Sequence, residues 1–495
     1  MTILIKSGNI IDGAGRPKFR ADLLIKDDKI AAIGIFPNKT ADLTIDALGL
    51  NVVPGFIDVN TDSDHYLTLF TNPLQEDFLL QGVTTIIGGQ CGSSLAPLFY
   101  GSLKSIRTWT TGEKINIDWN TINEFKGTLR KLGLGVNFGT LIGHSTIRRD
   151  LAGDDIRDLT DSEISVFQHT IESALKEGAL GLSTGLSYIH SRFVSYSEIK
   201  KLLKPVIRRG GVYATHLRDE KKDLIKSVKE TAFVAEEIGI PTIISHFRPI
   251  AGFEEQFREA LSIIENNLHK QNVFFDINPF GMSIMPIYTF LPPWTQQESL
   301  EKMLEYITDK NHRLGILKEL SLIENNLENL VIGEAENHPS LAGKTLGEFS
   351  ESRGLDLAEG LLMLMEITNL RAQLFYNNIN SDLLPELLFH PQALIASNSA
   401  SLGSQAALKP ERSTGTFKKF LKLAAEKNLP MEETIRKITS VPAKIFKIKK
   451  RGVLSEGNFA DLALLKENEA VHVIINGKLS VQEGKITNQK NGIPL

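Results

Sequence analysis

The sequence predicts an α/β protein that consists of a (β/α)8 TIM barrel and a small β-sandwich domain formed by both chain termini. Three observations support this prediction. Eight apolar runs alternate with stretches of helical periodicity, both ends of the chain show short strand patterns, and a length of 495 residues exceeds one ordinary compact domain. A barrel of about 250 residues or more with a smaller companion domain fits this length.

Apolar, β-branched runs fill the middle of the chain, and amphipathic stretches separate them. The eight runs are Asn51–Val59, Gly82–Gly88, Leu134–Ile142, Gly178–Ser183, Gly211–Thr215, Ile240–Ser245, Asn272–Ile277 and Gln392–Ala396. Nearly continuous apolar strands that alternate with helices are typical of a parallel sheet covered on both faces. Eight such units favour closure into a barrel. An open, doubly wound sheet is the alternative, and it is disfavoured because no glycine-rich phosphate-binding pattern follows the first run.

Both ends of the chain carry short strand patterns with turn residues between them. The predicted strands are Thr2–Lys6, Asn9–Asp12, Asp22–Lys26, Lys29–Ile35, Asp461–Leu465 and Val471–Ile475. Asn476 and Gly477 predict a tight hairpin turn, because both central residues must tolerate a positive φ. Neither end has a core of its own. We therefore expect residues 1–53 and 445–495 to pair into one β-sandwich domain, and residues 54–444 to form the barrel.

One interval breaks the alternation of strands and helices. Residues 281–345 contain Pro286, Pro292, Pro293 and Trp294, followed by helical segments rich in Glu and Asn. We interpret this interval as an insertion after the seventh barrel strand and as a candidate lid.

The composition excludes several classes of function. Charged residues make up 23% of the chain and the formal net charge is −4, which gives no support for binding to nucleic acid or an anionic membrane. The one cysteine, Cys91, excludes an internal disulfide and suits a reducing compartment. No signal-peptide pattern opens the chain, and no apolar run approaches the roughly 18 residues of a membrane span. We expect a cytoplasmic monomer or small homo-oligomer without nucleic-acid or membrane partners.

The active sites of (β/α)8 barrels lie at the C-terminal ends of the strands, and polar residues end most of the predicted strands here. These residues are Asp58, Asn60, Asp62, Asp64, Cys91, His144, Thr184, His216, His246, Asp276 and Asn398. Cys91, His216 and His246 form a donor set typical of Zn²⁺, with room for a fourth ligand. His216 and His246 are 30 residues apart, about one βα unit, which predicts adjacent strands.

Each of these residues also has an ordinary explanation. A lone cysteine is most often a small buried apolar residue, and a lone histidine is usually exposed or hydrogen-bonded in a core. The joint placement of the three residues at strand ends favours a metal site. His144 is a weaker candidate for the same site. The remaining histidines, His65 among them, we interpret as having no part in it.

Several segments spread along the chain share the motifs of a known family. They are Pro54–Asp58, Gln81–Thr85, Cys91–Leu98, Gly143–Arg148, Gly178–Gly185, Gly210–Glu220, Ile244–His246, Gly415–Phe417, Arg451–Gly452 and Glu456–Leu462. Together they resemble the D-aminoacylase (N-acyl-D-amino-acid deacylase) family of the amidohydrolase superfamily. The resemblance implies a zinc-dependent hydrolase of linear amides, with one tight Zn²⁺ held by Cys91, His216 and His246. It also implies a small-molecule substrate, an N-acyl amino acid or a similar carboxylate.

The resemblance also implies which residues bind the substrate carboxylate. Tyr188 and Arg412 match positions with that role, and Arg248 stands where the family usually has a lysine. A guanidinium suits the task because it can make a two-pronged contact with a carboxylate. Without the resemblance, Arg248 and Arg412 are equally well explained as solvated surface residues.

The chain departs from the family pattern at four positions. Asn60 and Asp62 stand where most members have a His-x-His pair, so we do not expect a second metal site. Asn278 replaces a usual aromatic residue. Asn398 takes the place of the aspartate that normally removes a proton from the attacking water. An amide can only form hydrogen bonds, and the loss of a general base typically lowers the rate by about 10²–10⁴.

Two hypotheses follow from these departures. In the first, the chain is an active deacylase in which another residue near the metal serves as the base. The candidates are Asp62, Asp64 and His144. In the second, the chain is a diverged relative that binds zinc and a carboxylate without hydrolysing amides, because Asn398 is not a base.

Overall fold

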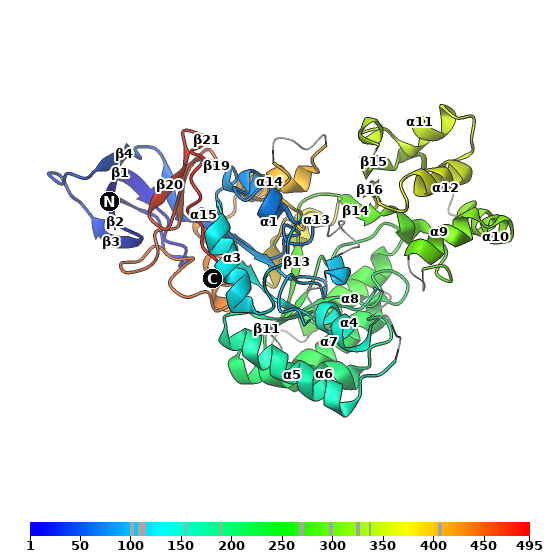
Figure 1. Cartoon of the computed structure of the whole chain (residues 1–495). Helices are drawn as coiled ribbons and strands as arrows, with labels where there is room; N and C mark the ends of the chain where they lie inside the picture. The colour runs from blue at the N-terminus through cyan, green and yellow to red at the C-terminus, as the bar shows by residue number, and fades with distance from the viewer. Residues whose placement is uncertain are drawn as a thin grey trace.

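The structure is a computed structural model, and it describes most of the 495 residues. The described ranges are 1–99, 103–106, 115–153, 155, 157–188, 191–266, 272–296, 300–322, 327–335, 338–403 and 408–495. Figure 1 shows three parts. A sheet built from both chain ends lies on one side, strands enclosed by helices lie in the centre, and an inserted segment with α9 to α12 projects on the other side.

The two chain ends form one nine-stranded sheet. Its order is β21-β20-β19-β18-β5-β1-β2-β3, with β4 paired to β1. Its strands are β1 (Thr2–Ile10), β2 (Phe19–Lys26), β3 (Lys29–Gly34), β4 (Leu43–Asp46), β5 (Asn51–Pro54), β18 (Leu462–Lys466), β19 (Glu469–Ile475), β20 (Lys478–Gln482) and β21 (Lys485–Ile486). The antiparallel pairing of β5 with β18 joins the N-terminal strands to the C-terminal ones, and apolar side chains from both ends share one core.

Eight parallel strands make up the barrel, each from one of the eight predicted runs. They are β6 (Phe56–Asp58), β7 (Val83–Gly88), β8 (Asn137–Thr140) continued by β9 (Ile142–Gly143), β10 (Gly181–Gly185), β11 (Val212–His216), β12 (Thr242–Ile244), β13 (Val273–Ile277) and β17 (Ala393–Ile395). β8 pairs with β7, and β9 pairs with β10. The first and last strands meet just beyond their ends, where Asn398 N donates to Asn60 O at 3.0 Å and Asp62 N donates to Ser399 O at 2.9 Å. The predicted fold class is confirmed.

The first predicted run, Asn51–Val59, contributes one strand to each of two sheets. Its first half is β5 of the terminal sheet and its second half is β6 of the barrel. Gly55 lies between them, and a Cβ atom there would lie only 2.1 Å from the Thr84 hydroxyl. Glycine therefore allows the chain to pass closely over the barrel as it changes sheets.

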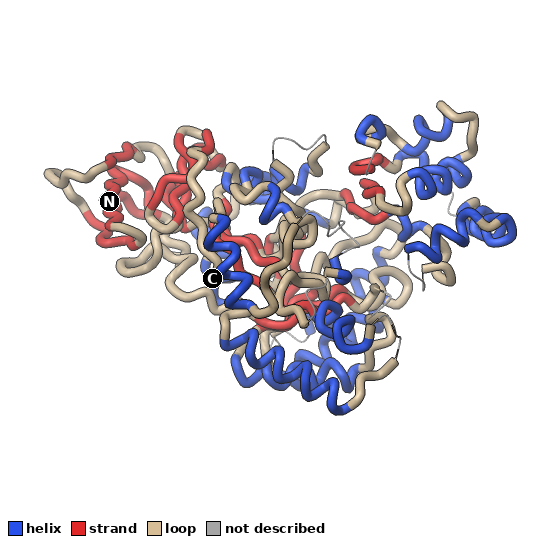
Figure 2. Tube along the Cα trace, viewed as in Figure 1, coloured by secondary structure: helices blue, strands red, loops and turns tan. Residues whose placement is uncertain are grey.

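Helices cover the outside of the barrel strands (Figure 2). They are α1 (Thr68–Thr71), α2 (Glu76–Leu79), η1 (Lys104–Ile106), α3 (Ile122–Leu132), α4 (His144–Ala152), α5 (Asp161–Lys176), α6 (Tyr196–Arg209), α7 (Leu224–Ile238), α8 (Glu254–Asn266), α13 (Leu384–Leu387), α14 (Glu411–Glu426), α15 (Met431–Ile438) and α16 (Ser440–Ile445). In α5, a capping box between Thr160 and Glu163 sets the start. Among the helices of the described residues, none is long and apolar enough to cross a membrane.

The insertion between β13 and β17 has a core of its own. Its elements are β14 (Met282–Pro286), η3 (Ile287–Phe290), α9 (Leu300–Thr308), α10 (Lys310–Leu320), η4 (Leu327–Asn329), β15 (Val331–Ala335), η5 (Pro339–Leu341), α11 (Leu346–Glu351), α12 (Leu357–Ile367) and β16 (Ala372–Asn377). β16 is the central strand of the antiparallel order β14-β16-β15. The segment therefore extends to Asn377, beyond the expected end at residue 345, because its sheet needs this last strand.

The hairpin turn between β19 and β20 allows a test of backbone strain. Gly477 has a φ of 73°, and a Cβ atom there would lie 1.7 Å from Asp27 O. Gly484 has the same φ of 73°, but a Cβ atom there would have no neighbour within 4 Å. We expect Gly477→Ala to lower the Tm by about 5 °C or more, because the backbone must move as well as adopt a strained φ.

Gly484→Ala is the matched control, since it introduces the same φ strain without the collision. Thermal unfolding of the two variants and the wild type measures the difference. Equal shifts in Tm for the two variants would show that the contact with Asp27 costs nothing.

Candidate metal centre

Three donor atoms from neighbouring parts of the barrel converge at its C-terminal end. Cys91 follows β7, His216 ends β11, and His246 follows β12. Cys91 Sγ lies 3.9 Å from His216 Nδ1 and 3.6 Å from His246 Nε2. Typical zinc bond lengths in a tetrahedral site place such S and N ligands about 3.6 Å apart. Among the described residues, this is the one group of three or more His, Cys, Asp and Glu side chains with all donor atoms within 4.8 Å.

The backbone at the mouth of the barrel is unusual. Cys91, His246 and Asn398 each follow a barrel strand, and their φ angles are 52°, 39° and 50°. Positive φ is uncommon outside glycine and tends to gather at functional sites. These sharp turns hold the three side chains at the ends of three strands.

The Glu220 carboxylate fixes the orientation of His246. Glu220 Oε1 lies 2.7 Å from His246 Nδ1. A proton on Nδ1 leaves the Nε2 lone pair free for a metal ion, the usual arrangement behind metal-bound histidines. Burial alone would raise the pKa of Glu220, but its interactions with His246 and His216, including the hydrogen bond to His246, hold it well below its usual range. Burial also lowers the pKa of His216 to about 3, so this ring is neutral at pH 7, as a ligand must be.

The environment of Cys91 also fits a cation. Burial raises the pKa of the Cys91 thiol well above its usual range, and the charges of Asp62, Asp276 and Glu220 raise it further. A positive ion next to the sulfur would offset both effects and favour the thiolate. The donor set and its charge therefore suit a divalent metal.

Asp276, at the end of β13, joins several strand ends. Its Oδ1 accepts hydrogen bonds from His246 N at 2.9 Å and from Asn398 Nδ2 at 2.7 Å. Its Oδ2 accepts one from Asn60 Nδ2 at 3.0 Å. The position of Asp276 at a strand end is predicted by the sequence, but its role is not. Asn60 and Asn398, which replace the expected histidine and aspartate, both bind this carboxylate.

Asp62 forms a pair with His65 beside the donor cluster. Asp62 Oδ1 lies 3.2 Å from His65 Nδ1, and His65 Nε2 lies 3.1 Å from Ser93 O. Burial opposes the charged ring, but Asp64 and Asp62 outweigh it and raise the pKa of His65 to about 9. Although burial raises the pKa of Asp62, the charges of His65, Arg412 and other groups bring it below its usual value. The prediction that His65 has no part in the site is therefore wrong; its spacing of three residues from Asp62 is the one sequence signal of this pair.

The other two candidate bases lie apart from the donor cluster. Asp64 Oδ2 accepts a hydrogen bond from Gly89 N at 2.6 Å, and its side chain is buried. His144 Nε2 lies 2.9 Å from Glu198 Oε1 of α6, and the His144 ring stacks on Phe167 of α5. His144 therefore packs against the outer helices.

Two of the three predicted carboxylate-binding residues contact the donor histidines, and the third, Arg412, acts electrostatically on Arg248. Arg412, in α14, is buried, and its Nε has no hydrogen-bond partner among the described residues. Burial, followed by the charge of Arg248, lowers the pKa of Arg412 to about 10. Arg248 Nε donates to His246 O at 3.2 Å. The Tyr188 ring lies 5.0 Å from the His216 ring. Burial raises the pKa of Tyr188, and the nearby Cys91 and Tyr288 of the insertion raise it further.

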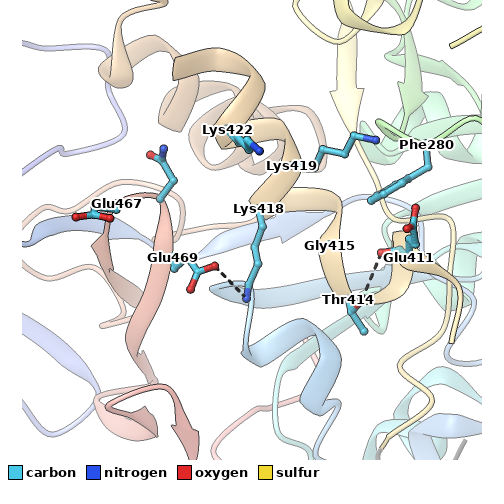
Figure 3. A pocket seen from close by; sticks show the side chains of 10 residues that line it. Phe280, Glu411, Thr414, Gly415, Lys418, Lys419, Lys422, Glu467 and Glu469 are labelled. Atoms are coloured by element: carbon cyan, nitrogen blue, oxygen red, sulfur yellow. Dashed lines mark hydrogen bonds and ion pairs between the residues drawn. The ribbon is translucent and has the colours of Figure 1, made fainter. Parts of the chain in front are cut away.

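A surface hollow on the other face of α14 is separate from this site (Figure 3). Lys418 pairs with Glu469 there at 3.9 Å, and Lys419 lies 4.3 Å from the centre of the Phe280 ring. Its lining residues include none of the cluster. The three lysines of the hollow already have neighbours: Glu469 for Lys418, the Phe280 ring for Lys419 and Glu426 for Lys422.

The contact between Glu220 and His246 predicts a loss of metal affinity. We expect Glu220→Gln to weaken zinc binding about 10–100-fold, the usual effect of removing a carboxylate behind a metal-bound histidine. Competition with a chromogenic chelator measures this change. Glu237→Gln, on the exposed face of α7, is the matched control and should keep wild-type affinity. Unchanged affinity in Glu220→Gln would show that this carboxylate does not support the site.

The raised pKa of His65 predicts a pH-dependent stability. The folded-state pKa of about 9 exceeds the ordinary 6.5. The ring charge therefore stabilises the fold fully below about pH 6.5, and this contribution is lost as the pH rises through about 9. We expect the Tm of the metal-free protein to fall between pH 7 and 9.5.

His65→Gln should show a smaller fall over the same range, measured by calorimetry. His472→Gln is the control, because burial lowers the pKa of His472 and its removal leaves the wild-type slope. The same slope in His65→Gln and wild type would contradict the assignment.

Known proteins resemble this chain over nearly its full length, although no protein-family model matches it. The D-aminoacylase of Alcaligenes xylosoxydans xylosoxydans is 29% identical over 473 residues, which cover 93% of this chain and 87% of that protein. A crystal structure of D-aminoacylase, 26% identical, covers 99% of this chain and 98% of that chain with a TM-score of 0.81.

A second solved structure shows the same fold. It is the N-acyl-D-glutamate deacylase of Bordetella bronchiseptica, complexed with zinc and a phosphonate inhibitor that mimics the tetrahedral intermediate of the reaction. It is 24% identical, has a TM-score of 0.82, and covers 100% of this chain and 99% of that chain. Together with the metal-type donor set at the barrel mouth, these likenesses lead to one conclusion. The chain belongs to the D-aminoacylase family of metal-dependent amidohydrolases.

Proposed function

We propose that this chain is a zinc-dependent deacylase of N-acyl amino acids, with the D series as the first candidates. The observation that carries the proposal is the buried guanidinium of Arg412, whose Nε has no hydrogen-bond partner among the described residues. A buried N–H donor without a partner is costly unless a ligand supplies an acceptor. A substrate carboxylate at this position would bring its amide to the Cys91, His216 and His246 cluster.

Each group in the site has a distinct task in this reaction. Arg412 and Arg248 bind the carboxylate, because their charges reinforce each other's attraction for an anion. Tyr188 lies at the same mouth as a hydrogen-bond donor. One zinc ion, held by Cys91 and the two histidines, would supply Lewis-acid activation of the amide carbonyl and of water. Asn60 binds Asp276, which supports one metal ion per chain.

A diverged relative without hydrolase activity is the second candidate. Asn398 Nδ2 donates to Asp276 Oδ1 at 2.7 Å, so this residue offers a donor where a proton acceptor is expected. Such a protein would bind zinc and a carboxylate ligand and release no amine.

A panel of N-acetyl and N-formyl amino acids in both D and L forms separates the two candidates. We expect zinc-dependent release of amine that prefers the D series, loss of activity with a chelator, and recovery on addition of zinc. Cys91→Ala should neither bind zinc nor turn over. No turnover across the panel, with about one zinc bound per chain, would favour the non-hydrolytic relative.

The role of Arg412 gives a sharper test of the same proposal. We expect Arg412→Gln to raise the KM for N-acetyl-D-amino acids about 10–100-fold, because a charge-assisted contact is lost. Turnover of the corresponding amino-acid amide, which lacks the carboxylate, should be as slow in the variant as in the wild type. Lys418→Gln, on the opposite face of α14, is the matched control. An unchanged KM in Arg412→Gln would contradict carboxylate binding at this residue.

A further inference from the structure

Among the described residues, five carboxylates lie at or after the ends of barrel strands, and their environments differ. They are Asp58, Asp62, Asp64, Glu220 and Asp276. A proton acceptor for an attacking water needs an oxygen that is open to the mouth and not already bound to donors. This requirement decides between them.

Four of the five fail this requirement. Asp58 is fully buried, and both of its oxygens lie near Ser397 N. Asp64 is 1% exposed and packs against the Gly88 backbone. Three donors occupy the oxygens of Asp276, which is also 1% exposed. Glu220 is 23% exposed, but its Oε1 contacts His246 Nδ1, which places this carboxylate behind the ring, on the side away from the donor cluster.

Asp62 meets the requirement. Its side chain is 16% exposed. Oδ1 contacts His65, and Oδ2 has no hydrogen bond to any residue that the structure describes. The Asp62 charge acts on Cys91 and Tyr188, as the Glu220 charge does from behind His246, so Asp62 lies near the donor cluster. It is not part of the group of donor atoms within 4.8 Å, which distinguishes it from a metal ligand.

His65 fixes the orientation of the Asp62 carboxylate. The ring is 0% exposed, and each nitrogen faces an oxygen, Asp62 Oδ1 at 3.2 Å and Ser93 O at 3.1 Å. A carbonyl oxygen can only accept, so Nε2 carries a proton, and the raised pKa of the ring places a second proton on Nδ1. The hydrogen bond from His65 therefore fixes Asp62 Oδ1, and Asp62 Oδ2 can face the mouth of the barrel. The titratable groups that act on Asp62 are His65, Arg412, His246 and Asp64.

We propose that Asp62 is the proton acceptor of this metal centre and that His65 is its positioning residue. The inference rests on the proposed function for the reaction itself. The water oxygen bonds to the amide carbon while one water proton passes to Asp62 Oδ2. The carbon–nitrogen bond then breaks, its electron pair goes to the nitrogen, and Asp62 returns the proton to that nitrogen. The carboxylate is regenerated, so no oxidant, reductant or co-reactant is needed.

The decisive variant is Asp62→Asn, compared with Asp382→Asn on an exposed turn as the matched control. We expect kcat to fall about 10²–10⁴-fold with little change in KM, the usual effect of losing a general base. Zinc affinity, measured by chelator competition, should stay at the wild-type value. Loss of zinc from Asp62→Asn would identify a metal ligand and overturn the proposal, as would an unchanged kcat.

Proton uptake gives a measurement that does not depend on turnover. A phosphonate analogue of an N-acyl-D-amino acid places anionic oxygens where the attacking water would be, so the acceptor should bind it in the protonated form. Calorimetry in buffers of different ionisation enthalpy counts the protons taken up. We expect about one proton per bound phosphonate for zinc-loaded wild type near pH 7.5 and none for Asp62→Asn. Equal uptake by both would refute the assignment.

His65→Asn tests the positioning role. Loss of the positively charged ring raises the pKa of Asp62, so the acidic limb of the kcat/KM profile should move to higher pH. An unmoved limb would refute this role. The outcomes also separate this inference from the proposed function. If the wild-type chain hydrolyses no amide of the panel but takes up a proton through Asp62, the proposed function is contradicted and the role of Asp62 as proton acceptor is supported.

Discussion

The Asp276 carboxylate is the interaction on which the mouth of the barrel depends. It accepts hydrogen bonds from the backbone of His246 and from the side chains of Asn60 and Asn398. These groups follow β12, β6 and β17, so one buried charge ties together strand ends from both sides of β13. A buried carboxylate needs several donors to remain charged. The same three bonds fix the backbone that presents His246 to the donor cluster.

This constraint explains the two asparagines better than a simple loss of function does. An aspartate at position 398 would face Asp276 across the present 2.7 Å contact, and two carboxylates at that distance cannot both be charged without a cation or a shared proton between them. An amide removes the conflict because it can donate. Asn60 acts in the same way on the other oxygen. The two substitutions are therefore coupled through a third residue.

The parts of the protein that could be predicted from sequence are those with local signals. Each barrel strand is a continuous apolar run, and Cys91, His216 and His246 lie at or just after the ends of such runs, so both the fold and the donor cluster follow from patterns of a few residues. The contact between Asn60 and Asp276 spans 216 positions and depends on which strand ends face each other. The charge of His65 depends on burial beside two aspartates. Neither has a periodic pattern that sequence alone could reveal.

The geometry at the closure of the barrel also shows why a proton acceptor can change strands without disturbing the metal. The segments after β6 and β17 are directly hydrogen-bonded, through Asn398 N to Asn60 O and Asp62 N to Ser399 O. Positions 62 and 398 therefore flank the same seam and border the same cluster. A carboxylate at position 62, after the first strand, can therefore act on the same substrate amide as a carboxylate at position 398, after the eighth strand. Because the donor cluster and the arginines come from other strands and from α14, their placement is independent of which side of the seam supplies the base.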